Sequence, residues 1–348
     1  MKISLCLIVK NEANNILDCL LSYAPVVSEM IVVDTGSTDH TKELVAKCGA
    51  KLFDAPWEND FSKARNISIE KASGDMILWT DADDYLSEEN AILLHKLSEH
   101  GSVDTAYSFI VMNSPDGING TRFSQVRMFP RREDLRFKFR VHEQIVPALI
   151  EGKVPLIQTG ITVTHAGYVK PEEVKKKQER NIPLILMEME SRPNDPVLNY
   201  QHAGALRDTG NYDDAIETYR KAMELAEKQG SAPHIEICVP LDLAMLYYHN
   251  LMNRVEAERW ARIALKKEPG NMKAKYVIAN ICYDTDRTEE AVDNFEAIIK
   301  MQDRIMLVPE DNNTIKMLSF ARLNDYYTRK GLYSERMELA KKAKEMVK

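Results

Sequence analysis

The sequence predicts an α/β domain built on a mostly parallel sheet, followed by an all-α domain of helical repeats. Two observations carry this prediction. Up to about residue 165, short runs rich in Ile, Val and Leu alternate with helical stretches, and after residue 195 a helical pattern recurs at a constant period. The length of 348 residues allows two domains of ordinary size. We place them at residues 1–170 and 195–348, joined by a linker helix over residues 171–194.

The first domain begins with four predicted strands separated by three predicted helices. The strands are expected at Ile3–Val9, Met30–Asp34, Lys51–Asp54 and Asp75–Thr80. The stretches between them place apolar residues three and four positions apart, as a helix requires; they are Asn14–Tyr23, Asp39–Lys47 and Phe61–Ala72. Alternation of this length predicts a parallel sheet that is covered by helices on both faces.

Four further strands are expected to extend the sheet in a mixed or antiparallel way. They are predicted at Asp104–Asn113, Thr121–Pro130, Arg136–Ile145 and Leu156–His165. A helix rich in Lys and Glu, about Pro171–Ser191, then leads to the segment Arg192-Pro-Asn-Asp-Pro196. The two prolines in that segment mark the start of the second domain.

The second domain repeats a pattern of small and aromatic residues. Gly210-Asn-Tyr-Asp-Asp-Ala215 opens one copy, and Ala257 and Ala291 take equivalent places in the next two, 34 residues apart. This is the period of the tetratricopeptide repeat, in which each helix pair needs its neighbour to bury its apolar face. We therefore expect a concave surface that binds a polypeptide or pairs subunits in a homodimer. A plain helical bundle is the alternative.

Composition excludes some classes of protein. The net charge of −7 argues against a general nucleic-acid binder, which needs a basic face. The five cysteines are scattered and odd in number, so a reducing compartment is expected. The apolar run Ile3–Val9 is too short to span a membrane and is read as a buried strand. We expect a cytoplasmic protein with no integral membrane segment.

Acidic segments follow three of the first four predicted strands. They are Lys10-Asn-Glu12, Asp34-Thr-Gly-Ser-Thr-Asp39 and Asp81-Ala-Asp-Asp84. The carboxyl ends of parallel strands meet at one edge of a sheet, and ligands of open α/β sheets bind at that edge. The three segments are therefore expected to form one site.

Asp81 and Asp83 are the candidate metal ligands of this site. Alternate residues of an extended segment point the same way, so both carboxylates can face one cation. Mg²⁺ or Mn²⁺ takes few oxygen ligands from a protein and completes its shell with phosphate oxygens and water. Such an ion stabilises the charge that builds on a departing diphosphate. For an isolated Asp-x-Asp, a solvated turn is the alternative.

Asp34 and Arg65 have a binding role and a structural alternative each. Asp34 can hydrogen-bond a nucleobase or a ribose, or it can cap a turn or helix. Arg65 lies in Lys63-Ala-Arg-Asn66 on the third predicted helix. Its guanidinium can bind a diphosphate as a rigid fork, or it can form a surface salt bridge.

Four segments together resemble, in the right order, the signature segments of family 2 glycosyltransferases with the Rossmann-like GT-A fold. They are Ile3–Glu12, Ile31–Asp39, Phe61–Asn66 and Trp79–Asp84. The resemblance covers about residues 1–170. The appended repeats are similar to those of a subgroup that joins this domain to tetratricopeptide repeats. That subgroup includes transferases that glucosylate peptides on cysteine.

The resemblance implies a hexosyltransferase that transfers sugar from a nucleoside-diphosphate sugar, often a UDP-sugar, with inversion and with Mn²⁺ or Mg²⁺. It implies that Glu12 and Asp34 contact the nucleoside, that Asp81 lies on the ribose or metal side, and that Asp83 holds the metal. Many members have two adjacent aspartates where this chain has Asp34-Thr35, which leaves the base open.

Other residues of the same motifs complete the predicted donor site; they are Val9, Asn11, Arg65 and Ala82. His165, which ends the last predicted strand, is expected to complete the metal shell or to contact the diphosphate, with a structural role as the alternative.

The segments Arg127-Met-Phe-Pro-Arg131 and Phe139-Arg-Val-His-Glu143 resemble the acceptor-side motif of the subgroup. An inverting transfer needs a general base that takes a proton from the acceptor. Glu143 is the candidate base and His142 the second candidate. Polar residues on an edge strand are the alternative.

The acceptor is the least determined part of the prediction. A peptide or protein bound through the repeats is the leading hypothesis, and a lipid-linked or surface saccharide is the second. A non-catalytic repeat scaffold is disfavoured because the set Glu12, Asp34, Asp81 and Asp83 is intact. A nucleotidyltransferase ranks lower, because such enzymes place a glycine-rich loop after the first strand and residues 10–15 contain no glycine.

Overall fold

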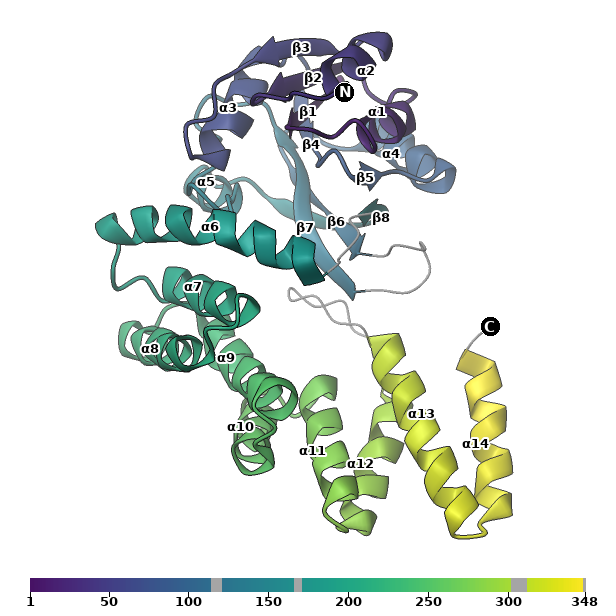
Figure 1. Cartoon of the computed structure of the whole chain (residues 1–348). Coiled ribbons are helices and arrows are strands. Elements are labelled where there is room, and N and C mark those ends of the chain that lie inside the picture. Colours follow the sequence, from purple (N-terminus) through teal and green to yellow (C-terminus); the bar gives the residue numbers. More distant parts are fainter. Residues whose placement is uncertain (114–120, 166–170, 302–311, 347–348) are drawn as a thin grey trace. The chain divides into compact units, whose positions relative to one another are not determined.

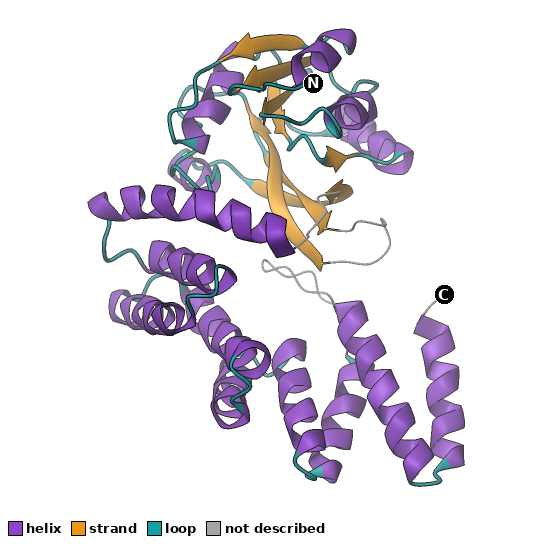
Figure 2. Ribbon diagram, viewed as in Figure 1, coloured by secondary structure: helices purple, strands orange, loops and turns teal. Residues whose placement is uncertain are grey.

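Eight strands form one mixed sheet in the N-terminal part of the chain (Figures 1 and 2). The computed structural model describes residues 1–113, 121–165, 171–301 and 312–346. The chain divides into two compact units, one containing Met1–Val169 and the other Lys170–Arg304 and Asp311–Lys348.

The sheet combines a parallel half and a mixed half. Its strands are β1 (Ile3–Val9), β2 (Glu29–Asp34), β3 (Lys51–Asp54), β4 (Met76–Trp79), β5 (Asp84–Tyr85), β6 (Ala106–Asn113), β7 (Thr121–Pro130) and β8 (Leu156–His165). They lie in the order β3-β2-β1-β4-β7-β6-β8-β5. The first four are parallel, β7 is antiparallel to β4 and β6, β8 is parallel to β6, and β5 is antiparallel to β8. The predicted parallel sheet with a mixed extension is confirmed.

Helices cover both faces of the sheet. They are α1 (Ile16–Tyr23), α2 (Thr41–Lys47), α3 (Phe61–Lys71), α4 (Glu88–His100) and α5 (Val146–Glu151). Apolar residues of α1, α2 and α4 pack with Leu5 and Leu7 of β1 in one core cluster. Apolar residues of α3 and α5 pack with Cys6 of the same strand in a second cluster. The alternation of side chains along β1 therefore serves two cores at once.

The segment from residue 136 to residue 145 is not the predicted strand. Phe139 and His142 have φ values of 78° and 52°, which interrupt an extended chain. A single antiparallel bridge, Lys138 to Gln144, remains. The buried residues Phe137, Val141 and Ile145 recur every fourth position, so the alternation that predicted a strand did not describe burial here.

The second unit consists of helices. After α6 (Pro171–Ser191), its described part contains four helix pairs: α7 (Pro196–Asp208) with α8 (Tyr212–Gln229), α9 (Pro233–Met245) with α10 (Arg254–Lys267), α11 (Met272–Asp284) with α12 (Thr288–Lys300), and α13 (Asn312–Arg329) with α14 (Tyr333–Met346). A π-helical turn, Leu246–Asn250, extends α9. Ala215, Ala257 and Ala291 are fully buried at equivalent places. The predicted all-α repeat architecture is confirmed.

Among the described helices, none has the length and apolar character needed to cross a membrane.

Candidate active site

The carboxyl ends of β1, β2, β4 and β8 lie at one edge of the sheet, because these four strands run in the same direction. The residues that follow or end them include Glu12, Asp34, Asp81 and His165. The edge therefore collects acidic residues and one histidine from segments far apart in the sequence.

Asp34 presents a buried acceptor at the end of β2. Its Oδ1 accepts hydrogen bonds from the backbone N–H groups of Gly36 and Ser37, each at 2.9 Å. Its Oδ2 is buried and has no hydrogen-bond partner among the described residues. Burial raises the pKa of Asp34, but hydrogen bonds from Ser37 and Gly36 and the charge of Lys42 outweigh it, so the pKa lies below its usual value. Asp34 caps this turn and retains one free acceptor atom.

The loop after β1 is tied to the loop after β2. The backbone N–H of Asn11 donates to Ser37 Oγ at 2.9 Å, and that of Thr38 donates to Asn11 Oδ1 at 2.8 Å. Val9, the last residue of β1, is buried beside Asp34 in the sheet register. These bonds fix the strand ends relative to each other.

Glu12 lies next to the other carboxylates. Its Oε2 accepts from Asn15 Nδ2 at 3.0 Å. Burial raises the pKa of Glu12, and the negative charges of Asp83 and Asp81 raise it further. Glu12 therefore lies within the electrostatic field of Asp81 and Asp83.

Arg65 joins Asp81 to Glu143. Its Nη2 donates to Asp81 Oδ1 and its Nε donates to Glu143 Oε1, both at 2.6 Å. Arg65 is only 6% exposed, so the surface salt bridge considered above does not describe it. Its guanidinium carbon lies 4.4 Å from the ring centroid of Trp79. The predicted donor residue and the predicted base are thus held by one buried cation.

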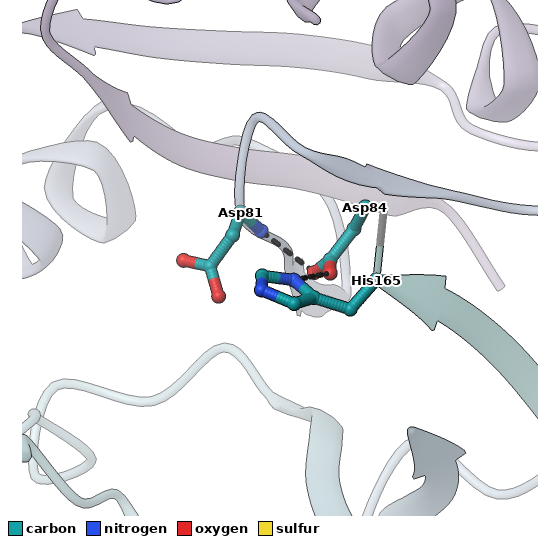
Figure 3. A group of neighbouring side chains, drawn as sticks. All are labelled: Asp81, Asp84 and His165. Atoms are coloured by element: carbon teal, nitrogen blue, oxygen red, sulfur yellow. Dashed lines mark hydrogen bonds and ion pairs between the residues drawn. The ribbon is translucent and has the colours of Figure 1, made fainter. Parts of the chain in front are cut away.

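Asp84 and His165 meet through the two-residue strand β5. Asp84 is the register partner of His165 in the antiparallel pair of β5 and β8. The Asp84 Oδ1 and His165 Nδ1 atoms are 2.9 Å apart. A dashed line in Figure 3 marks this interaction. Asp84 Oδ2 accepts from Arg127 Nη1 at 2.8 Å, from Thr80 Oγ1 at 3.0 Å and from the backbone N–H of Asp81 at 2.9 Å.

Sequence reasoning did not identify the site roles of Asp84 and Arg127. The available signal was a charged residue inside the apolar run Val126-Arg-Met-Phe129 of β7, where Arg127 is only 2% exposed. A fully buried arginine requires an acidic partner, and the third aspartate of the segment Asp81–Asp84 supplies it.

Asp83 faces the other nitrogen of His165. Asp83 Oδ2 lies 3.4 Å from His165 Nε2, and the two side chains are 27% and 24% exposed. Burial raises the pKa of Asp83; the nearby charge of His165 opposes this, while Asp81 and Asp84 add to it. Burial also raises the pKa of Asp81, but Arg65 and then Arg127 outweigh it and leave the pKa below its usual range.

These residues fit a divalent cation. Among the described residues, the carboxylates of Asp81, Asp83, Asp84 and Glu143 pair with two guanidinium groups, those of Arg65 and Arg127, and with the imidazole of His165. Four carboxylates thus exceed the three groups that can carry positive charge. Ligand atoms of Asp81, Asp84 and His165 lie within 4.8 Å of one another. Carboxylate oxygens with one imidazole nitrogen form a donor set that suits Mn²⁺ or Mg²⁺. The structure thus brings together the three predicted ligands Asp81, Asp83 and His165, with Ala82 buried between the two aspartates.

The candidate base lies on the irregular segment that follows β7. The side chain of Asn66 bonds both backbone groups of Phe137, with Nδ2 donating at 3.0 Å and Oδ1 accepting at 2.8 Å. The backbone N–H of Phe61 donates to the Arg140 carbonyl at 2.8 Å. Helix α3 therefore holds the segment in place. Glu143 on it reaches Arg65, whereas the adjacent His142 is exposed.

Comparison with known proteins finds one family match in each of the two units. Residues 4–149 match the family described as glycosyl transferase family 2, and residues 197–229 match a tetratricopeptide repeat. A TPR repeat-containing protein of Synechococcus elongatus is 37% identical over 150 residues, which is 43% of this chain and 36% of that protein. The prophage-derived glycosyltransferase SunS of Bacillus subtilis is 30% identical over 257 residues, 71% of this chain and 59% of the relative. The chain thus spans roughly a third to three fifths of these curated relatives.

Solved structures with lower similarity include two complexes with UDP-sugars. Glucosyl-3-phosphoglycerate synthase of Mycobacterium tuberculosis, in complex with Mn²⁺ and UDP-glucose, is 18% identical with a TM-score of 0.40 and covers 51% of this chain and 78% of its own. Staphylococcus aureus TarS, in complex with UDP-GlcNAc, is 15% identical with a TM-score of 0.40 and covers 78% of this chain and 93% of its own.

The N-terminal part of the chain is an α/β domain that collects acidic residues at the carboxyl edge of a mixed sheet. It is a family 2 glycosyltransferase domain, and it is joined to tetratricopeptide repeats.

Proposed function

We propose that the protein transfers a sugar from a nucleoside-diphosphate sugar, a UDP-sugar in the leading case, to a side chain of a peptide or protein, with inversion and with Mn²⁺ or Mg²⁺. One observation carries the proposal. A free buried acceptor on Asp34, a cation site at Asp83 and His165, and a candidate base at Glu143 converge on one edge of a glycosyltransferase sheet.

The donor is held by the ends of β1, β2 and β4. Asp34 Oδ2 is an unsatisfied acceptor for an N–H of a base or an O–H of a ribose, beside Asn11 and Glu12. Leaving such an atom unpaired in a buried place costs about 1–3 kcal/mol, which a ligand donor recovers. Arg65 Nη1 is a second buried atom with no partner among the described residues, and it is a donor suited to a diphosphate oxygen.

The cation is assigned to Asp81, Asp83 and His165. When bound, it supplies positive charge to the diphosphate as the bond to the sugar breaks. The chain contributes fixed ligands: Asp81 is held by Arg65, and His165 is held by Asp84.

Glu143 takes the proton of the acceptor as that group attacks the face of the anomeric carbon opposite the diphosphate. Its carboxylate is oriented by the 2.6 Å bond from Arg65 Nε and is 13% exposed, so it is fixed and still accessible. The repeats are the reason for proposing a peptide or protein acceptor, because stacked helix pairs of this kind present extended binding surfaces.

Nucleotide release by the full chain tests this proposal. The purified protein is incubated with UDP-, GDP- and dTDP-sugars, with Mn²⁺ or Mg²⁺ and with chelator, alone or with peptide or saccharide acceptors. We expect metal-dependent release from one donor, and a loss of about 10²-fold or more in Asp83→Asn, since one charged ligand of the leaving-group cation is gone.

The matched control is Asp75→Asn, an exposed aspartate that directly precedes β4, at the opposite edge of the sheet. Release that persists in chelator or in Asp83→Asn contradicts the metal assignment. Transfer to saccharides but to no peptide contradicts the peptide acceptor.

A further inference from the structure

We infer that Asp84 is a positioning residue that fixes the tautomer of His165 for metal binding and is not itself a metal ligand. This inference rests on the proposed metal-dependent transfer. Ligand atoms of Asp81, Asp84 and His165 lie close enough to hold one ion, so proximity alone does not separate Asp84 from Asp83. Their hydrogen bonds do.

Both carboxylate oxygens of Asp84 are already used. Oδ2 accepts three donors, from Arg127 Nη1, Thr80 Oγ1 and the backbone N–H of Asp81. Oδ1 bonds His165 Nδ1 at 2.9 Å. The side chain has no exposed surface. A metal bound by Asp84 would have to displace one of these buried bonds, whereas Asp83 is 27% exposed and its Oδ2 faces His165 Nε2.

The donors on Asp84 decide the state of His165. A guanidinium, a hydroxyl and an amide N–H all point at Oδ2, so the carboxylate is an acceptor, and Nδ1 of His165 must carry the hydrogen of the remaining bond. In neutral imidazole the lone pair is then on Nε2, the nitrogen that faces Asp83. Figure 3 shows the ring between Asp84 and the Asp81 side chain. A carboxylate that orients a metal-binding histidine in this way commonly contributes 10- to 100-fold in metal affinity.

The substitution Asp84→Asn reverses this arrangement. The amide oxygen of the new side chain will face the three donors from Arg127, Thr80 and Asp81, which leaves its NH₂ group toward His165 Nδ1. That NH₂ can only donate, so Nδ1 becomes the acceptor and Nε2 carries the hydrogen. A protonated Nε2 cannot bind a metal.

The test combines two readouts on the full chain. Imidazole ¹⁵N shifts of the metal-free protein report the tautomer of His165, which His165→Gln identifies by removing its signals. Mn²⁺ titration in the presence of UDP, followed by electron paramagnetic resonance, reports affinity. We expect an Nδ1–H tautomer in the wild type, an Nε2–H tautomer in Asp84→Asn, and Mn²⁺ binding weakened about 10- to 100-fold by the substitution. The control Asp75→Asn is expected to change neither readout.

Three results overturn the inference. They are an Nε2–H tautomer in the wild type, an unchanged Mn²⁺ affinity in a folded Asp84→Asn, or the complete loss of Mn²⁺ binding without a change of tautomer, as expected if Asp84 were a ligand. If Asp84→Asn does not fold, the wild-type spectrum alone supports or overturns the assignment. A wild type that binds no Mn²⁺ with UDP removes the proposed function as well, so the two failures are distinguishable.

Discussion

At the scale of single residues, the site depends on where buried charges are paired. Arg65 is the partner of both Asp81 and Glu143, and its own side chain is 7% exposed. This one cation therefore serves the donor side and the acceptor side of the candidate site. We expect the loss of Arg65 to lower stability and the loss of Glu143 to slow the reaction.

Substitution of Glu143 by Gln is expected to remove the base and leave the fold intact. The amide keeps an oxygen for Arg65 Nε but cannot take a proton, so kcat should fall by about 10²- to 10⁴-fold. Binding of UDP, measured by calorimetry, should stay within about twofold of the wild type. The comparison variant is His142→Gln, because His142 is adjacent and exposed. A larger loss of kcat in His142→Gln would transfer the role of base to that histidine.

Substitution of Arg65 by Met should act on stability first. Two carboxylates, those of Asp81 and Glu143, would lose their partner in a mostly buried place, and breaking such a pair costs about 3–5 kcal/mol. Urea unfolding measures the free energy of unfolding directly. Arg65→Lys is expected to recover only part of it, since an ammonium cannot span both carboxylates as a guanidinium fork does. A fully stable Arg65→Met would show that solvent already screens these charges.

The sequence could predict residues of this site only where their neighbours in the chain carry the signal. Asp81 and Asp83 are predicted because they alternate after a strand, and Asp34 because it ends one. The bond from His165 to Asp84 joins positions 81 residues apart and depends on the register of β5 with β8, which no local pattern encodes. The same holds for Arg127, whose partner Asp84 lies on a different strand.

At the scale of elements, strands were easier to predict than irregular segments. The bounds of β1, β3, β7 and β8 agree with those expected from apolar runs. Helix α4 was not predicted, and its central apolar residues show why: Ile92 and Leu93 are 57% and 42% exposed, and only Leu94 is buried. A helix with one buried apolar residue in its middle gives little periodic signal.

The irregular segment after β7 is expected to depend on Asn66. This side chain bonds both backbone groups of Phe137, as a neighbouring strand would. In Asn66→Ala, amide hydrogen exchange should therefore speed up in peptides covering residues 136–145, and kcat should fall because Glu143 lies on that segment. Peptides from β1 and β2 serve as the internal control. Unchanged exchange at residues 136–145 would mean that the buried Phe137, Val141 and Ile145 hold the segment without Asn66.

At the opposite edge of the sheet, the hydrogen bonds of Glu29 make a pH-dependent contribution to stability. Glu29, at the start of β2, accepts from Ser4 Oγ at 2.6 Å and from Lys51 Nζ at 2.7 Å. Burial raises the pKa of Glu29, but the bonds from Lys51, Ser4 and Ser73 outweigh it and lower the pKa to about 2. A lowered carboxyl pKa stabilises the fold above the ordinary value of 4.5, and this stabilisation is lost as the pH falls toward 2.

Glu29→Gln should therefore lower the free energy of unfolding at pH 7, on the order of 1–2 kcal/mol. The difference from the wild type should shrink between pH 4.5 and about 2, the window set by the unfolded and folded pKa values. Urea unfolding at several pH values measures it. Glu70→Gln, on the exposed face of α3, controls for the loss of one charge. A difference that stays constant down to pH 2 would assign the effect to shape and not to ionisation.

At the scale of the whole molecule, the two units are stabilised in different ways. The first has one core cluster on each face of its sheet, and the second has one core cluster that runs through its helix pairs. Ion pairs join neighbouring repeats, as where Glu258 of α10 pairs with Arg287 before α12. Glu258, Cys282 and Glu290 lie close enough to hold a metal, but Arg262 and Arg287 already neutralise the two glutamates. We therefore interpret this group as a clamp between repeats.

We expect the donor and the acceptor to stabilise the two units separately. All the side chains that we assign to the donor and the cation lie within Met1–Val169. A ligand that binds only the folded state stabilises it by about 2.7 kcal/mol at 100 times its Kd. UDP with Mn²⁺ should therefore slow amide exchange around residues 9–12, 34–38 and 81–84 and raise the unfolding temperature of that unit. Exchange in α7 to α12 should stay as it was.

A peptide acceptor, added next, should slow exchange in the repeats if they bind it. Protection of the repeats by UDP and Mn²⁺ alone would contradict a donor site confined to the first unit. Protection of neither unit by the peptide, together with transfer to a saccharide, would leave the repeats without a role in acceptor binding. Because each unit has its own core, a ligand can stabilise one unit against local unfolding without the other. The exchange pattern therefore shows which unit each ligand binds.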